Sequence, residues 1–264
     1  MLYIAYVYVR DDRKMEYFWL QQDDVPAGMG YPLFGFAHLA SIFVTLALAT
    51  LFGIHFFKAG EKKQRLVLKA IPVIMIGLEI FKDLFLVSVH RFGTAYLPLH
   101  ACSLGMFVFF FREFLPRKKA KDYLGEVAYI LIMPGGLAGL IFADWTEYYP
   151  VWNFINLHSY VWHGLLVLYP ILIRKRGDIK LQVKHIYRVI SFLLVVVPPI
   201  YAFDKAYGRN YFFVNWPVEG SPLAFFAEHM GNPGYLVGYV ALAMAVFLLI
   251  YLMDWIWDGL RGRG

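Results

Sequence analysis

The residues best suited to chemistry are one cysteine and a histidine within apolar sequence. Cys102 is the only cysteine in the chain. An imidazole that removes the thiol proton creates a thiolate nucleophile, as in cysteine acyl transfer. His163 is the candidate base, because it shares one helical face with other polar residues. Cys102 and His163 are therefore a candidate catalytic pair, and the alternative for Cys102 is a small packing residue.

A second polar group begins at Glu79. Lys82, Asp83 and His90 follow it at spacings that place all four on one stripe of a helix. An ionised group at membrane depth costs at least about 2.5 kcal/mol, so such groups need partners or a polar cavity. The stripe is therefore either an internally neutralised packing cluster or the lining of a functional cavity.

The segment around His163 carries a third polar stripe, formed by Asn153, Asn156, Ser159 and Tyr160. His158 points roughly 140° away from His163 on a helix. Their spacing of five is poor for a zinc pair, and one cysteine excludes a multi-cysteine cage. We expect neither a metal nor a cofactor.

Membrane helices are the elements that must position these residues. The chain is 60% hydrophobic, with a mean hydropathy of +0.54, which exceeds what a soluble domain of 264 residues can bury. Apolar stretches of roughly 20 residues take up most of its length. They predict an all-α polytopic membrane helix bundle of seven transmembrane helices, at residues 33–57, 66–89, 97–114, 124–142, 150–173, 186–203 and 233–256.

These seven spans place one membrane domain at residues 33–264. Residues 1–32 are expected to form an extracytoplasmic segment. Within it, alternating residues from Leu2 to Val9, a charged turn at 11–14 and a second run at 15–20 indicate a possible hairpin.

The charges in the loops predict the orientation. Cytoplasmic loops of membrane proteins carry an excess of Lys and Arg. Of the 25 Lys and Arg residues, 18 fall in the loops after the first, third and fifth spans and in the C-terminal tail. Six lie on the other side, and Lys82 lies within a span. The N-terminus is therefore expected outside and the C-terminus in the cytoplasm of a multi-pass protein of the cell membrane.

The net charge of +6 follows from these loops and does not indicate a nucleic-acid partner, because the basic residues form no single patch along the sequence. With the predicted orientation, His38, Glu79, Cys102 and His163 lie in the outer half of the membrane or near its midplane. Four helices then contribute polar groups to one level. The long outer loop at residues 204–232 is expected either to cover such a cavity or to act as a stabilising cap.

Several short segments, taken in order, resemble one membrane family. They are Phe34-Gly35-Phe36-Ala37-His38, Glu79, Leu97-Pro98-Leu99-His100-Ala101-Cys102, Tyr149-Pro150, Trp162-His163-Gly164 and Asn210-Tyr211-Phe212-Phe213. Their order and spacing are similar to those of the bacterial YwaF-like proteins, which are related to animal transmembrane protein 164. The resemblance covers most of residues 33–215. It implies a lipid acyltransferase in which Cys102 and His163 act as a pair.

The leading hypothesis is a membrane lipid acyltransferase or acyl hydrolase whose partners are phospholipids or lysophospholipids. Cys102 attacks the ester, His163 is the general base and then the acid, and Glu79 or His38 orients the imidazole. The expected substrate-binding residues are Lys82, Asp83, His100, Asn156, Asn210 and Tyr211. The oligomeric state stays open.

The alternative is a transporter or small-molecule-binding membrane protein that uses the stripe of Glu79, Lys82 and Asp83. The sequence shows no inverted repeat to favour it. A retinal protein is disfavoured because the last predicted span has no lysine, and a ceramidase-type zinc hydrolase because that span has no histidine.

Overall fold

A computed structural model describes residues 16–260, in which helices and short turns, and no strands, form the fold. The α-helices are α2 (Phe36–Lys58), α3 (Glu61–Ser88), α4 (Ala101–Phe114), α5 (Lys118–Val127), α6 (Met133–Ile141), α7 (Phe154–Lys175), α8 (Ile186–Tyr207), α9 (Pro222–Met230) and α10 (Tyr235–Leu260). A π-helical turn, η2 (Ala128–Ile132), joins α5 to α6 without a break. The prediction of an all-helical protein is confirmed.

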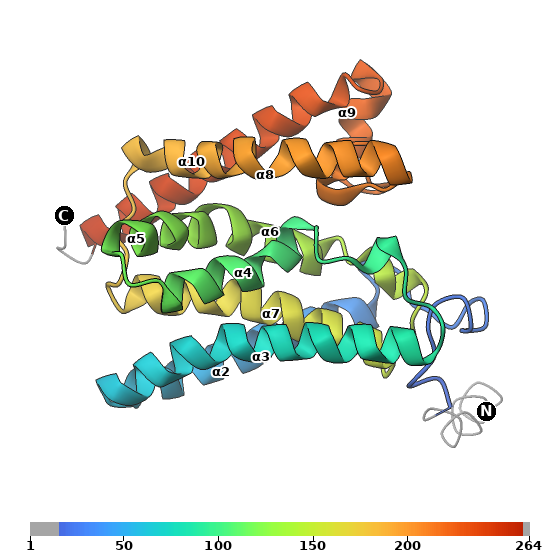
Figure 1. Ribbon diagram of the computed structural model, residues 1–264, viewed down its shortest axis with the longest axis horizontal. Helices are drawn as coiled ribbons and strands as arrows, with labels where there is room; N and C mark the ends of the chain where they lie inside the picture. The colour runs from blue at the N-terminus through green and yellow to red at the C-terminus, as the bar shows by residue number, and fades with distance from the viewer. Residues whose placement is uncertain (1–15, 261–264) are drawn as a thin grey trace.

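The long helices run along one common direction (Figure 1). Helix α7 is central and packs against α2, α3, α4 and α6. Helices α8 and α10 lie beside this group, and α5 and η2 connect them to it. The described end of the N-terminal segment lies at one end of the bundle and the last turn of α10 at the other (Figure 1).

Glycines let α4 and α6 approach α7 closely. A Cβ added at Gly105 of α4 would lie 2.4 Å from Cδ2 of Leu166 on α7. A Cβ added at Gly136 of α6 would lie 2.9 Å from Cβ of the same leucine. Small residues at such contacts are the usual means of close packing between membrane helices. Helix α7 is consequently held between α4 and α6.

Within residues 16–260, four helical segments are long and apolar enough to cross a membrane. They are Phe36–Lys58, Lys118–Glu147, Val183–Tyr207 and Tyr235–Leu260. Helices α3, α4 and α7 correspond to the other three predicted spans. Helix α4 has only 14 residues, and α3 and α7 carry the polar stripes. The count of seven spans and the orientation remain predictions.

Helices α4 and α7 each begin four residues later than expected, for local reasons. The segment predicted from residue 97 becomes helical at Ala101, after Pro98 and an extended His100 at the N-cap. The segment predicted from residue 150 begins at Phe154, because Asn153 caps α7 by accepting hydrogen bonds from the backbone N–H groups of residues 155 and 156. The first arm and turn of the predicted hairpin lie outside the described residues, and residues 16–19 form turns.

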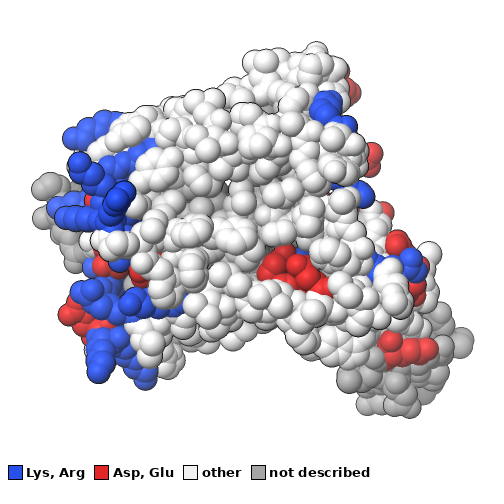
Figure 2. Space-filling model, in the orientation of Figure 1, with Lys and Arg blue, Asp and Glu red and all other residues white. Residues whose placement is uncertain are grey.

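Basic residues gather at the end of the bundle where α10 ends (Figure 2). Buried ion pairs join the helices there. Glu126 of α5 accepts hydrogen bonds from Arg188 of α8 (2.9 Å) and from the Tyr251 hydroxyl of α10 (2.7 Å). Arg174 of α7 contacts Asp254 of α10 at 2.7 Å. These pairs connect α8 and α10 to the central helices.

The Glu126→Ala substitution should destabilise the protein by on the order of 3 kcal/mol, because it leaves the Arg188 guanidinium without its buried carboxylate. Thermal unfolding in detergent measures the effect. Glu61→Ala is the matched control: its ion pair with Arg65 has both side chains about two-thirds exposed, and its loss should change stability by less than about 1 kcal/mol. Equal effects of the two substitutions would contradict a structural role for the Glu126 pairs.

Candidate functional site

A cavity of about 930 Å³ opens among the loops at the end of the bundle opposite the basic residues. Four separate parts of the chain line it: residues 30–33, the start of α4 with residue 95, the η3 turn (Asp144–Glu147) with Tyr148, and residues 208–219 between α8 and α9. The volume is in the range of small-molecule sites. His100, Asn210 and Tyr211, three predicted substrate-binding residues, line this cavity.

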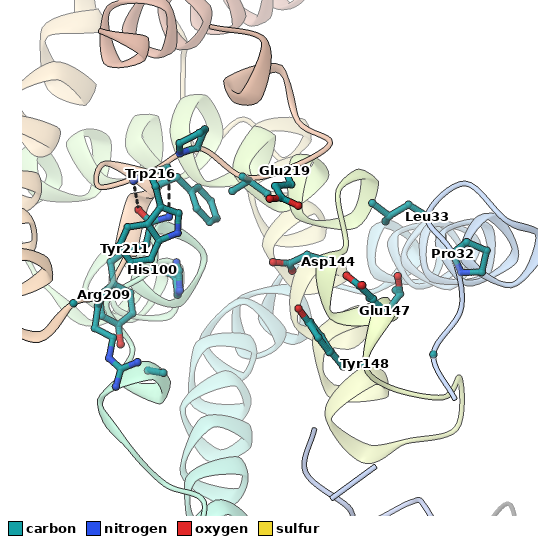
Figure 3. A pocket seen from close by; sticks show the side chains of 18 of the residues that line it. Pro32, Leu33, His100, Asp144, Glu147, Tyr148, Arg209, Tyr211, Trp216 and Glu219 are labelled. Carbon is teal, nitrogen blue, oxygen red and sulfur yellow. Dashed lines mark hydrogen bonds between the residues drawn. The ribbon is translucent and has the colours of Figure 1, made fainter. Parts of the chain in front are cut away.

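Opposite charges occupy different walls of the cavity (Figure 3). His100 and Arg209 lie on one side, next to Tyr211 and Trp216. The carboxylates of Asp144 and Glu147 lie across the cavity from them, beside Tyr148, and Glu219 lies above. A ligand with one anionic and one cationic group fits such an arrangement better than a ligand with a single charge.

Hydrogen bonds and ring contacts hold the basic wall. Arg209 donates from Nε to the Thr94 hydroxyl (2.8 Å), and the Tyr211 hydroxyl donates to the Thr94 carbonyl. The ring of His100 packs edge-on against that of Tyr211, with centroids 4.6 Å apart. Phe212 and Phe213 have φ of 55° and 56°, a left-handed conformation that is strained for bulky residues. This wall is thus fixed at the expense of local backbone strain.

Asn210 shapes the loop with its own side chain. Its Oδ1 accepts from the backbone N–H groups of Asn215 (3.0 Å) and Trp216 (3.1 Å), and its Nδ2 donates to the Trp216 carbonyl (2.9 Å). The polar atoms of Asn210 are therefore engaged within the protein. Its contribution to the cavity is the position of Trp216.

The acidic wall is closed by the N-terminal segment. The Tyr31 backbone N–H donates to the Thr146 carbonyl (2.8 Å), and a Cβ added at Gly30 would lie 2.0 Å from the Glu147 carbonyl oxygen. A side chain cannot fit at Gly30 unless the backbone moves. Nearby, Arg91 forms an ion pair with Asp24, and this hydrogen-bonded guanidinium holds the pKa of the Asp24 carboxyl below its usual value. The segment is therefore anchored from both sides.

Asn156, a predicted substrate-binding residue, is fully buried and connects the same segment to α7. Its Oδ1 accepts from the Tyr31 hydroxyl (2.9 Å), and its Nδ2 donates to the Val151 carbonyl (2.8 Å). Asn156 does not line the cavity. In this structure it positions Tyr31, which does.

His38 is also fully buried, and both of its ring nitrogens are engaged. The Phe34 N–H donates to Nδ1 (2.9 Å), so Nε2 carries the proton and donates to the Leu140 carbonyl (2.9 Å). His38 thereby joins α2 to α6. It forms no hydrogen bond with His163 within residues 16–260, so the predicted orienting contact is not present.

The group that orients His163 is a carbonyl of its own helix. Nδ1 lies 2.7 Å from the Ser159 carbonyl oxygen. Because a carbonyl only accepts, Nδ1 carries the proton and Nε2 has a free lone pair, as a general base requires. The indole of Trp145 stacks on the imidazole, with centroids 5.1 Å apart and planes at 16°. A Cβ added at Gly139 would lie 2.5 Å from Nε2, so this glycine makes room for the ring.

Cys102 is the second residue of α4 and packs against the apolar cluster that includes Met106, Trp162 and Leu166. Its carbonyl accepts a hydrogen bond from the Trp162 indole (3.3 Å). No hydrogen bond joins Cys102 to His163 in the described part of the chain. The structure packs α4 against α7, the helix that holds the histidine.

The charged residues of the α3 stripe pair with one another. Lys82 Nζ lies 2.8 Å from Oε1 of Glu79 and 3.3 Å from Oδ1 of Asp83. The Glu79 and Lys82 side chains are only 7% and 12% exposed. None of the three residues lines the cavity. The three side chains therefore pair with one another within α3, and their formal charges sum to −1.

Sequence reasoning missed seven charged or aromatic residues of the cavity: Tyr31, Asp144, Glu147, Tyr148, Arg209, Trp216 and Glu219. They lie in connecting segments on the predicted outer side, and that shared side is the only sequence signal for them. It also missed His158, whose buried Nε2 has no hydrogen-bond partner in residues 16–260. Within the same residues, no group of three or more His, Cys, Asp or Glu residues is placed to hold a metal ion.

The Gly139→Ala substitution should displace the His163 ring and lower stability by about 1–3 kcal/mol, because the new methyl group would overlap the imidazole. Thermal unfolding in detergent measures this change. Gly135→Ala in the same helix is the control, since its Cβ would meet nothing within 4 Å. If Gly139→Ala were as stable as Gly135→Ala, the close approach of α6 to the imidazole would be refuted.

Comparison with known protein families identifies this architecture. The profile of the TMEM164 family matches residues 33–251, which include all the helices from α2 to α9 and most of α10. Comparisons with curated proteins and with solved structures gave no match. The match covers well over half of the 264 residues and includes Cys102, His163 and the residues of both charged walls. The chain is therefore a membrane protein that belongs to the TMEM164 family.

Proposed function

We propose that this protein is a seven-span membrane enzyme that transfers or hydrolyses acyl groups of phospholipids, with its cavity on the outer side and its C-terminus in the cytoplasm. The observation that carries the proposal is the cavity with oppositely charged walls at one end of an apolar bundle. The concentration of Lys and Arg at the other end supports the orientation (Figure 2). The cell membrane is the proposed location.

The cavity suits the headgroup of a zwitterionic phospholipid or lysophospholipid. Arg209 and His100 offer donors to a phosphate, for which a guanidinium is well suited. Asp144 and Glu147 face the opposite side and complement an ammonium group. Trp216 adds an aromatic ring at a level where membrane proteins favour such rings.

In the proposed reaction, His163 Nε2 takes the thiol proton of Cys102, and the thiolate attacks the ester carbonyl of the lipid. The ester C–O bond breaks, a thioester forms on Cys102, and the lysolipid leaves with the proton from His163. The hydroxyl of an acceptor lysolipid, or water in hydrolysis, then attacks the thioester while His163 takes its proton. The acyl product departs and the thiol regains the proton.

Three features support these roles. The hydrogen bond to Ser159 leaves Nε2 of His163 as a proton acceptor. Cys102 lies in the first turn of α4, where backbone N–H groups stabilise negative charge on a thiolate or on an oxyanion. The chain also belongs to the TMEM164 family, and its resemblance to that family implies a catalytic cysteine–histidine pair. The reaction requires the thiol to turn from its apolar contacts toward His163 when the lipid binds.

The Cys102→Ala protein should lose acyl exchange between phospholipid and lysophospholipid in vesicles, because it has no nucleophile. His163→Gln should reduce the rate by about 10²–10⁴-fold, the usual contribution of a general base. Mass spectrometry of the lipids measures both effects. Ser88→Ala, which alters a hydroxyl bonded only within its own helix, is the control. Full activity of Cys102→Ala would rule out the covalent mechanism.

The polar group between α3 and α7 favours a second candidate, a transporter for a proton or a polar solute. His158 Nε2 is buried without a hydrogen-bond partner among the described residues. Unsatisfied polar groups at membrane depth often mark pathways.

Transport and acyl transfer make opposite predictions for two variants. If the protein is a transporter, Glu79→Gln should abolish counterflow uptake into vesicles by removing one carboxylate that neutralises Lys82, while Cys102→Ala should not affect it. If the protein is an acyltransferase, Cys102→Ala should abolish acyl exchange. Neither the unmodified protein nor the two variants should then show counterflow uptake.

A further inference from the structure

The basic end of the bundle carries a second cavity, far from the one already described. Its volume is about 660 Å³, and residues 60–69 of the α2–α3 turn and the start of α3 line it. Lys62, Lys63 and Lys69 contribute three cationic groups, and Leu66 contributes an apolar surface. The acyl-transfer proposal makes no use of these residues.

The positive charge of this cavity is not compensated by the protein. Its one acidic residue, Glu61, is paired with Arg65 at 2.6 Å. In residues 16–260, no carboxylate lies within ion-pair distance of the three lysines. The neighbouring guanidinium of Arg176 is paired with Asp178 at 2.9 Å. A net charge of about +3 is therefore available to an external anion.

An apolar surface continues from this cavity along α3. Leu66, Val73, Ile80 and Leu84 share one stripe of the helix with Lys62 and Lys69. These four apolar side chains are between 50% and 67% exposed. The stripe points away from the core, so it faces the surroundings of the bundle over several turns. A lipid chain fits along such a stripe, whereas a small soluble anion uses only its basic end.

Helix α4 borders the same surface with aromatic rings. Phe111 and Phe114 are 49% and 47% exposed and lie about one turn apart on α4. Lys69 Nζ lies 5.9 Å from the centroid of the Phe114 ring, which places this lysine between the two helices. Cationic groups above exposed aliphatic and aromatic side chains match the headgroup and acyl chains of an anionic lipid.

We propose that an anionic phospholipid of the cytoplasmic leaflet binds at this surface, with its phosphate between Lys62, Lys63 and Lys69 and an acyl chain along α3. The site lies at the opposite end of the molecule from the headgroup cavity. It selects lipids by net negative charge, whereas the headgroup cavity has opposite charges on its walls. Its occupancy does not depend on Cys102 or His163.

Native mass spectrometry of the full chain in detergent tests this proposal with phosphatidylglycerol as the probe and phosphatidylcholine as the neutral comparison. The unmodified protein should retain phosphatidylglycerol preferentially. The variant Lys62→Gln/Lys63→Gln/Lys69→Gln should bind it more weakly, by about fivefold for each lysine removed. The milder variant Lys62→Gln/Lys63→Gln keeps the test valid if the triple variant does not fold.

The matched control removes the same charge at the same end of the bundle, by Arg117→Gln/Lys118→Gln/Lys119→Gln at the start of α5. This variant should keep the affinity for phosphatidylglycerol. Equal losses in the two triple variants would show only a general attraction to anionic surfaces and would overturn the site. Displacement of the bound lipid by millimolar inorganic phosphate would assign the lysines to a soluble anion and would also overturn it.

Discussion

The close contact of α7 with its neighbours determines where the polar groups of this protein lie. Gly105 on α4 and Gly136 and Gly139 on α6 leave space for side chains of α7, so the three helices meet with little volume between them. In a membrane, every polar group at such an interface must find a partner within the protein. The imidazole of His163 therefore lies between Gly139 and Trp145 and uses a carbonyl of its own helix.

The same requirement explains why most polar residues of the apolar spans have structural contacts. His38 joins α2 to α6, Asn156 holds the N-terminal segment, and Lys82 forms ion pairs with two carboxylates on α3. In each case the partner is a backbone carbonyl, a hydroxyl or an opposite charge nearby. These contacts position the loops at the cavity end, where side chains meet water and remain available to a ligand.

The two ends of the bundle therefore differ in chemistry. At one end, loops from four parts of the chain bring carboxylates and cations to opposite walls of one cavity. At the other end, Lys and Arg dominate, and the buried pairs of Glu126 and Arg174 connect α8 and α10 to the remaining helices. A bilayer protein with such ends can recognise different lipid charges in its two leaflets.

The sequence alone determined the helical character, the positions of the long helices, the basic end and the family, because hydrophobic periodicity, loop charge and motif order are local properties of the chain. The segments that carry the family resemblance also singled out His100, Asn210 and Tyr211 as substrate-binding residues, and all three line the cavity. Only the tertiary structure decided which polar stripes face one another. Residues 30, 100, 144 and 209 are far apart in the sequence, and helix packing alone places them around one cavity. The sequence can place the thiol of Cys102 and the imidazole of His163 only at a similar depth. In the described residues no hydrogen bond joins them, because the rotation of α4 and α7 about their axes directs each side chain to a different neighbour.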